Sequence, residues 1–199
     1  DDNLTIASAA TDLTNTTISG IDVLTAAGTG DNDLSIDAES ISGEVTIIAS
    51  ATANLKITAT GDYTNLSITD NDFDSMIITD GKTVTITEKG LTNAADGQVE
   101  SMIAINSTAA VDANLVINMS GTKLDLSAVT VGATNDVDTT ITGTTGADII
   151  TLWDASTAGS ATVVTGNGGG DEFRFEDGSG NALVDNEFTS VEADAINIT

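Results

Sequence analysis

Short apolar alternations, separated by turns, recur along the first half of the chain at a nearly constant step. Their leading apolar residues follow one another at intervals of 11, 10, 11, 10, 11 and 11 residues: Leu13, Leu24, Leu34, Val45, Leu55, Leu66 and Ile77. A strand of about five residues plus a turn produces such a step. The phrase Asn-Leu-x-Ile also recurs, starting at Asn3, Asn54, Asn65 and Asn114. The chain is therefore expected to be all-β, with helix scarce.

Two architectures suit strands of this kind: a parallel β-solenoid of stacked coils, or an antiparallel β-sandwich in the N-terminal part. The constant step, the repeated phrase and an aromatic content of only 3% favour the solenoid, since large rings fit poorly inside a narrow coil. Two steps would form one coil of about 21 residues. The Asp80-Gly81 pair lies between two alternating runs and predicts a local hairpin over residues 76–87, which either architecture can contain.

Composition excludes several functional classes. The chain has no histidine and no cysteine, which removes the usual general base, the Ser-His and Cys-His nucleophile systems, and thiol-ligated metals. The formal net charge of −26 would repel nucleic acid and the anionic surface of a membrane, and no apolar stretch is long enough to insert into one. Of the 31 acids, 23 are Asp, the shorter side chain that is frequent in turns and in oxygen-ligand cation sites. This bias favours cations as partners.

Two glycine-rich turns lie near the C-terminus, in "GTTGADIIT" (143–151) and "TGNGGGDEFRF" (165–175). When they are aligned, Gly143 matches Gly166, Gly146 matches Gly169, and Asp148 matches Asp171. The interval from Gly143 to Gly166 is 23 residues, close to two of the upstream steps. The order turn 143–148, strand 149–153, turn 154–160, strand 161–165, turn 166–171 would form one coil and place Asp148 beneath Asp171.

These turns resemble the nonapeptide G-G-x-G-x-D-x-U-x of the RTX (repeats-in-toxin) proteins, although the second glycine is missing from both copies and the copies are not nine residues apart. The resemblance implies Ca²⁺ held by sixth-position carboxylates and by backbone carbonyls of stacked turns. The ligands it implies here are Asp148, Asp171, Gly143, Thr145, Ala147, Gly166, Gly168 and Gly170.

Three other acidic stretches are weaker candidates for cation sites. "TDNDFDS" carries Asp70, Asp72 and Asp74, but it lacks the glycine and the bidentate glutamate of an EF-hand loop, so an EF-hand is rejected. "GTGDND" (28–33) is an acidic glycine turn without the RTX spacing. "EDGSGN" (176–181) offers Asp177 as a further ligand, but its pattern does not fit cleanly.

The expected organisation is a strand-repeat region over residues 1–135 that continues into an RTX-like calcium-binding part over 136–199. Because the chain opens on Asp1-Asp2, we expect it to be an internal piece of a longer protein. The Thr-, Asn- and Ala-rich strands with an RTX-like part look like bacterial surface-layer proteins and large adhesins exported by type I secretion.

The leading hypothesis is a non-enzymatic structural module on the extracellular bacterial cell surface, stabilised by calcium and self-associating into a lattice or fibre. A calcium-folded secretion module of a type I exported enzyme or toxin is the second hypothesis. A polysaccharide-acting β-helix is the third; it ranks low because Arg174 is nearly isolated as a basic residue and no two carboxylates form an evident acid and base pair.

Overall fold

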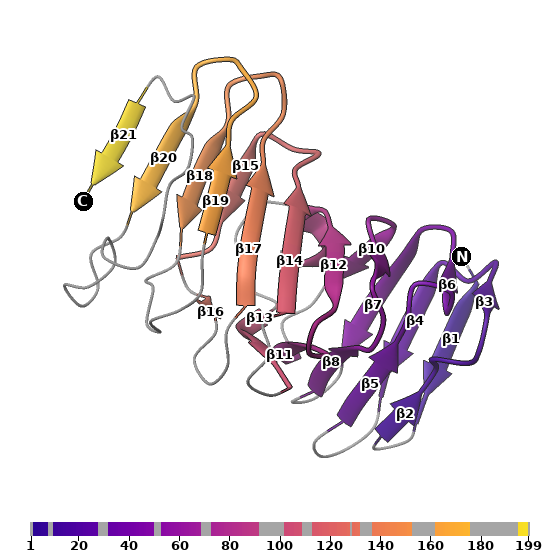
Figure 1. Ribbon diagram of the computed structural model, residues 1–199. Coiled ribbons are helices and arrows are strands. Elements are labelled where there is room, and N and C mark those ends of the chain that lie inside the picture. The colour runs from indigo at the N-terminus through magenta and orange to yellow at the C-terminus, as the bar shows by residue number, and fades with distance from the viewer. Residues whose placement is uncertain are drawn as a thin grey trace.

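The described residues form a stacked, all-β solenoid of parallel strands. The structure is a computed structural model that describes residues 2–7, 10–27, 32–49, 53–68, 73–91, 102–108, 113–127, 129–131, 137–152, 162–175 and 195–198. Coil follows coil along one axis, with the N-terminus and the C-terminus at opposite ends of the stack (Figure 1). The expected all-β class and the parallel solenoid are both confirmed.

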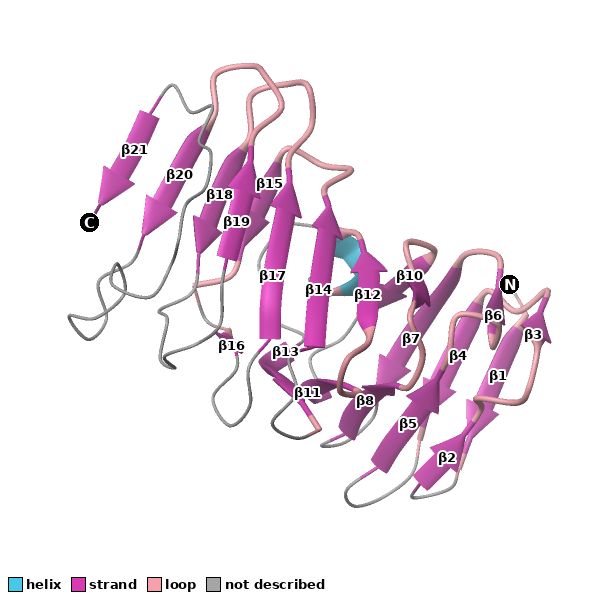
Figure 2. Ribbon diagram, viewed as in Figure 1, coloured by secondary structure: helices cyan, strands magenta, loops and turns pink. Residues whose placement is uncertain are grey.

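Four larger sheets and one small sheet form the sides of the coils (Figure 2). The first sheet contains β1 (Asn3–Ile6), β4 (Val23–Ala26), β7 (Val45–Ala49) and β10 (Leu66–Ile68). The second contains β2 (Ala10–Asp12), β5 (Asn32–Ile36), β8 (Ala53–Ile57), β11 (Phe73–Ile78), β13 (Met102–Ser107) and β16 (Thr130–Val131).

The third sheet contains β9 (Gly61–Asp62), β12 (Thr83–Ile86), β14 (Ala113–Asn118), β17 (Val137–Thr142) and β19 (Thr162–Thr165). The fourth contains β15 (Lys123–Asp125), β18 (Ile149–Leu152), β20 (Glu172–Phe175) and β21 (Ala195–Ile198), and the small sheet pairs β3 (Ile18–Ser19) with β6 (Ile41–Ser42). All strand pairings among the described residues are parallel, so the antiparallel sandwich expected as the alternative is wrong.

The predicted coil length is found in the second sheet. Leu34 pairs with Leu55 and Leu55 with Met76, while the neighbouring hydrogen bonds from Asn54 to Asp33 and from Ser75 to Asn54 each span 21 residues. One detail differs from the predicted spacing, in which Ile77 is the leading apolar residue of this strand. A register shift between Phe73 and Ser75 places Met76 in the core in its stead. The short strands β3, β6 and β9 also give the early coils a third side, which the two-step spacing does not predict.

The hairpin predicted over residues 76–87 is wrong. Strand β11 pairs with β8 and β13 in the second sheet, whereas β12 pairs with β9 and β14 in the third. Gly81 does adopt a positive φ of 66°, and Lys82 N donates to Thr79 O at 3.1 Å. A tight turn of this kind suits a corner between two sheets as well as a hairpin, and each strand already has partners in the coils before and after it.

The core is a continuous column of aliphatic side chains inside the coils. Strands such as β4, β12 and β19 alternate between buried and half-buried residues, as expected when one side of each strand faces the column. Leu, Ile and Val supply most of the column, and among the described residues Phe173 is the largest fully buried side chain. Burying one Leu or Ile stabilises a fold by about 1.5–3 kcal/mol, so the repeat itself supplies the driving force for stacking.

The column runs through the expected boundary near residue 135. Strand β14 pairs with β17 over six residues, and β13 pairs with β16. Strands on the two sides of residue 135 therefore pair with one another in the same sheets. No helix among the residues that the structure describes is long and apolar enough to span a membrane.

Candidate functional site

The two glycine turns stack directly on one another at one corner of the solenoid. The first turn (143–148) joins β17 to β18, and the second turn (166–171) joins β19 to β20. The flanking strands fix their register, because Thr142 pairs with Thr165 and Ile149 with Glu172. Asp148 N donates to Asp171 Oδ1 at 3.0 Å across 23 residues. The sequence interval thus places the two aspartates one above the other, as predicted.

Asp148 is fully buried inside the first turn, and the chain satisfies both of its oxygens. Thr144 N donates to Oδ2 at 2.7 Å, and Thr144 Oγ1 donates to Oδ1 at 2.8 Å. Gly143 must be glycine, because a Cβ there would lie 2.6 Å from Asp148 Oδ2 and 2.7 Å from Gly166 O. The carboxylate, the Gly143 backbone and the Gly166 carbonyl therefore crowd into one small space between the turns.

Asp171 is only 1% exposed, and its two oxygens differ. Oδ1 accepts from Asp148 N, whereas Oδ2 is buried and has no hydrogen-bond partner among the described residues. A buried carboxylate oxygen without a donor is costly, and a positive ion is one of the few partners that offset the cost. This orphan oxygen fits a hard cation such as Ca²⁺, which is the chemistry implied by the RTX resemblance.

The second turn follows an unusual backbone path. Asn167, Gly168 and Gly169 have φ values of 70°, 121° and 105°, and Asn167 is the only non-glycine residue with positive φ among those described. A Cβ on Gly169 would overlap the carbonyl of Gly146 in the turn below. Asn167 Nδ2 donates to Gly143 O at 3.0 Å. The glycine run therefore lets one turn lie directly against the other.

The remaining predicted ligands lie around this corner. Gly143 and Gly166 are buried with the two aspartates, while Thr145, Ala147 and Gly170 are exposed and Gly168 is partly exposed. Sequence reasoning missed Thr144 and Asn167, whose side chains donate hydrogen bonds to oxygens of the first turn. Their signal was present, because they occupy the position of the missing second glycine. Within the described ranges no three acidic side chains cluster as metal ligands, so a cation here would depend on two carboxylates and on backbone oxygens.

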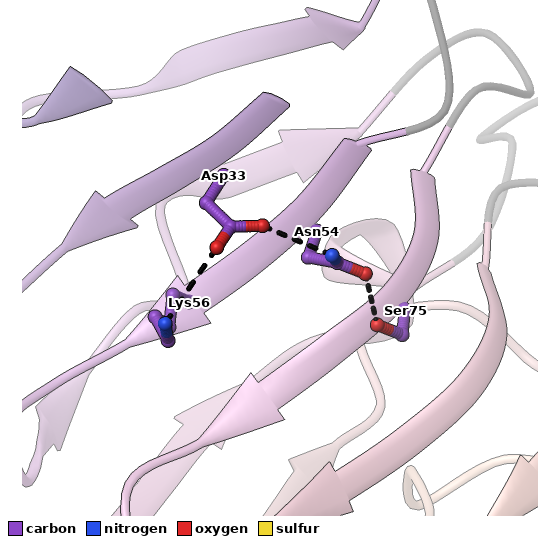
Figure 3. Close-up of polar contacts among 4 residues, drawn as sticks. All are labelled: Asp33, Asn54, Lys56 and Ser75. Carbon is purple, nitrogen blue, oxygen red and sulfur yellow. Dashed lines mark hydrogen bonds and ion pairs between the residues drawn. The ribbon is translucent and has the colours of Figure 1, made fainter. Parts of the chain in front are cut away.

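A second polar feature lies on the outer side of the second sheet, in three successive coils (Figure 3). Asn54 Nδ2 donates to Asp33 Oδ1 at 2.9 Å, and Ser75 Oγ donates to Asn54 Oδ1. Lys56 Nζ lies 3.6 Å from Asp33 Oδ2. Such cross-strand pairs contribute about 0.2–1 kcal/mol each, so this polar ladder ties β5, β8 and β11 together.

A groove of about 330 Å³ lies over the amino-terminal ends of first-sheet strands. Asp22, Glu44, Thr46, Ser67 and Lys89 contribute to its walls. Its mixture of two carboxylates, hydroxyls and one ammonium suits a hydroxylated ligand better than an apolar one. A saccharide is a hydroxylated ligand of this kind, so this groove is the candidate site for one.

The other acidic candidates lie largely outside the described residues. These are Asp70 and Asp72, residues 28–31 of the 28–33 turn, and residues 176–181 with Asp177.

Comparisons of the chain with protein-family models, curated protein sequences and solved structures gave no match. The strand pairing alone defines the class, an all-β parallel solenoid. The RTX resemblance rests on residues 143–175.

Proposed function

We propose that this chain is a structural module of an extracellular bacterial surface-layer or adhesin assembly, stabilised by calcium at the two glycine turns. The observation that carries the proposal is the stacked pair of buried carboxylates, Asp148 and Asp171, one of which keeps an orphan oxygen. Nothing in this role requires catalysis.

Calcium fits this corner on chemical grounds. Ca²⁺ takes six to eight hard oxygen ligands and would supply the positive charge that two buried carboxylates need. Asp148 and Asp171 are the charged ligands, and the turn carbonyls of Gly143, Thr145, Ala147, Gly166, Gly168 and Gly170 are the neutral ones that the RTX resemblance implies. Glycine lets the two backbones approach closely enough to share such oxygens.

The rest of the molecule is consistent with a structural role. A repetitive column of coils makes a stiff rod whose stability is built from nearest-neighbour contacts. The outward residues of first-sheet strands, Asn3, Thr5, Val23, Thr25, Thr46, Ile48 and Ser67, carry no charge in a chain of net charge −26. Protein contacts favour surface areas depleted of charge, so this sheet is where copies of the chain would meet.

Thermal melts with calcium and with chelator test the calcium site. Binding to the folded state should stabilise the parent by about 2.7 kcal/mol when calcium exceeds its Kd a hundredfold. Asp171→Asn and Asp148→Asn keep the side-chain shape but remove one charge each, and should reduce that gain. Asp12→Asn, far from the turns in sequence, should retain it. Equal calcium shifts in all four proteins, or no shift in the parent, would show that the glycines only form a corner.

Two alternative functions remain as proposals. A calcium-folded secretion module of a type I exported enzyme or toxin would use the same turns, and an active domain adjoining this segment in the full gene product would favour it. A polysaccharide-acting β-helix would use the groove at Asp22, Glu44 and Lys89. Cleavage in a screen of polysaccharides, abolished in Glu44→Gln, would favour that function over the structural one.

A further inference from the structure

The second position of each glycine turn carries a hydrogen-bond donor where the RTX nonapeptide has glycine. In the first turn this residue is Thr144, whose N–H and hydroxyl both donate to the Asp148 carboxylate at 2.7 and 2.8 Å. In the second turn it is Asn167, whose amide reaches down to the Gly143 carbonyl at 3.0 Å. A side-chain donor at this position thus meets an oxygen of the first turn in both cases.

The Asn167 contact is built into the backbone. A φ of 70° is unfavourable for most residues, but asparagine tolerates it better than almost any side chain other than glycine. In this conformation the exposed Asn167 still bonds to Gly143, 24 residues earlier in the chain. Gly143 N in turn donates to Thr165 O at 2.7 Å. Both the N–H and the carbonyl of Gly143, the first residue of the first turn, are therefore hydrogen-bonded to the next coil.

We propose that Thr144 and Asn167 form an ion-independent latch, in which Asn167 locks the second glycine turn onto the first and Thr144 closes the first turn on Asp148, both by donating to oxygens that a cation would otherwise coordinate. The latch holds the corner when calcium is absent, and it competes with calcium for the Asp148 carboxylate and the Gly143 carbonyl. The competition rests on the proposed calcium site, whereas the locking of the turns does not. Asp171 Oδ2 is the carboxylate oxygen that the latch leaves open.

Locking is tested with Asn167→Asp in chelator. Aspartate keeps the side-chain shape and the tolerance for positive φ, but it cannot donate to Gly143 O. Asn118→Asp, at another exposed asparagine, is the matched control for the added charge. We expect N167D to melt about 2–4 °C below N118D, as for the loss of one hydrogen bond in a chain of this size. Equal melting temperatures would overturn the latch, whether or not the parent binds calcium.

Competition is tested by isothermal titration with calcium. Asn167→Gly restores the nonapeptide glycine and adds no new ligand. Tighter calcium binding by this variant can therefore come only from the loss of the Asn167 hydrogen bond to Gly143 O. Thr144→Val frees Asp148 Oδ1, with Thr140→Val as its exposed control on β17. We expect each test variant to bind calcium about fivefold more tightly than the parent, the effect of one competing hydrogen bond. Unchanged affinity in both would overturn the competition. A parent that binds no calcium, with N167D still melting below N118D, would support the latch and reject the calcium site.

Discussion

At the scale of single residues, equivalent positions in the repeat have different chemistry. Asp148 and Asp171 occupy the same place in their turns and are equally buried, yet Asp148 has donors on both oxygens and Asp171 on only one. The second residue of each turn makes the difference, because Thr144 donates to both oxygens of Asp148, whereas Asn167 donates to Gly143 O and leaves Asp171 with the single donor that Asp148 N of the neighbouring coil supplies. An aspartate in such a turn is therefore best judged together with the coils on either side.

Tyr63 gives a residue-level prediction about pH. Its hydroxyl donates to Ala59 O at 2.8 Å, and burial together with the nearby charge of Asp37 raises the pKa of Tyr63 to about 12 from 10.0. A raised pKa means that the fold favours the neutral phenol. The stability it contributes is therefore complete below about pH 10 and is lost as the pH rises towards about 12.

Tyr63→Phe should remove this part of the alkaline sensitivity, because phenylalanine does not titrate. Urea unfolding of the parent and the variant at about pH 9 and about pH 11.5 measures the difference, and lysine titration is common to both proteins. The parent should lose more stability between the two pH values than Y63F does. Identical losses would contradict the burial of Tyr63 as a neutral phenol.

At the scale of elements, the short 3-10 helix η1 (Glu88–Gly90) replaces a strand where one sheet gives way to another. Strand β10 follows β9 earlier in the chain, and β15 follows β14 later. Helix η1 follows β12 at the same point of its coil, where the other coils have a strand. The buried Glu88 accepts from Ser120 N, Ser120 Oγ and Gly121 N at 2.6–2.8 Å, just before β15 begins. This carboxylate therefore connects the coil that begins with η1 to the next coil, which begins with the fourth-sheet strand β15.

Glu88→Gln should destabilise the fold more than a typical surface change. Glutamine keeps the length of the side chain, but it replaces one acceptor oxygen by an NH₂ group that faces donors from the next coil. Hydrogen bonds to a charged group contribute about 1.5–3 kcal/mol, and a loss within this range is expected in urea unfolding. Glu39→Gln, at an exposed glutamate, should change stability by less than about 0.5 kcal/mol. Equal effects would contradict the linking role of Glu88.

At the scale of the whole molecule, charge controls contact between copies. A net charge of −26 opposes association, while the uncharged outer side of the first sheet favours it. Divalent cations that neutralise the surrounding acids would shift this balance towards assembly. Calcium therefore has two proposed effects, one inside the glycine turns and one between molecules.

Light scattering should show a monomer in chelator and larger species as calcium is raised to the millimolar range. Thr25→Asp places a charge at the middle of the first sheet and should suppress this association, whereas Thr140→Asp, on the outer side of the third sheet, should not. A parent that stays monomeric would contradict self-association. Equal association of the two variants would place the contact on another surface.

The sequence by itself determined the features that depend on local repetition. A coil contacts mainly its two neighbours, so the 10–11-residue step, the repeated Asn-Leu-x-Ile phrase and the low aromatic content together favoured stacked parallel coils, and the 23-residue interval was enough to place Asp148 beneath Asp171. These features depend on the period and composition of the repeat, which are local properties of the sequence.

The tertiary structure decided which strands and side chains of neighbouring coils contact one another. Asp80-Gly81 has the sequence of a hairpin, but neighbouring coils pair with both flanking strands and make it a corner. The three donors to Glu88 lie 32 or 33 residues away, beyond the range of any local pattern. The open oxygen of Asp171 and the Asn167 contact to Gly143 likewise depend on how two turns lie against each other in space. The residue types in each turn allow several hydrogen-bonding partners, and only the stacking of the coils selects among them.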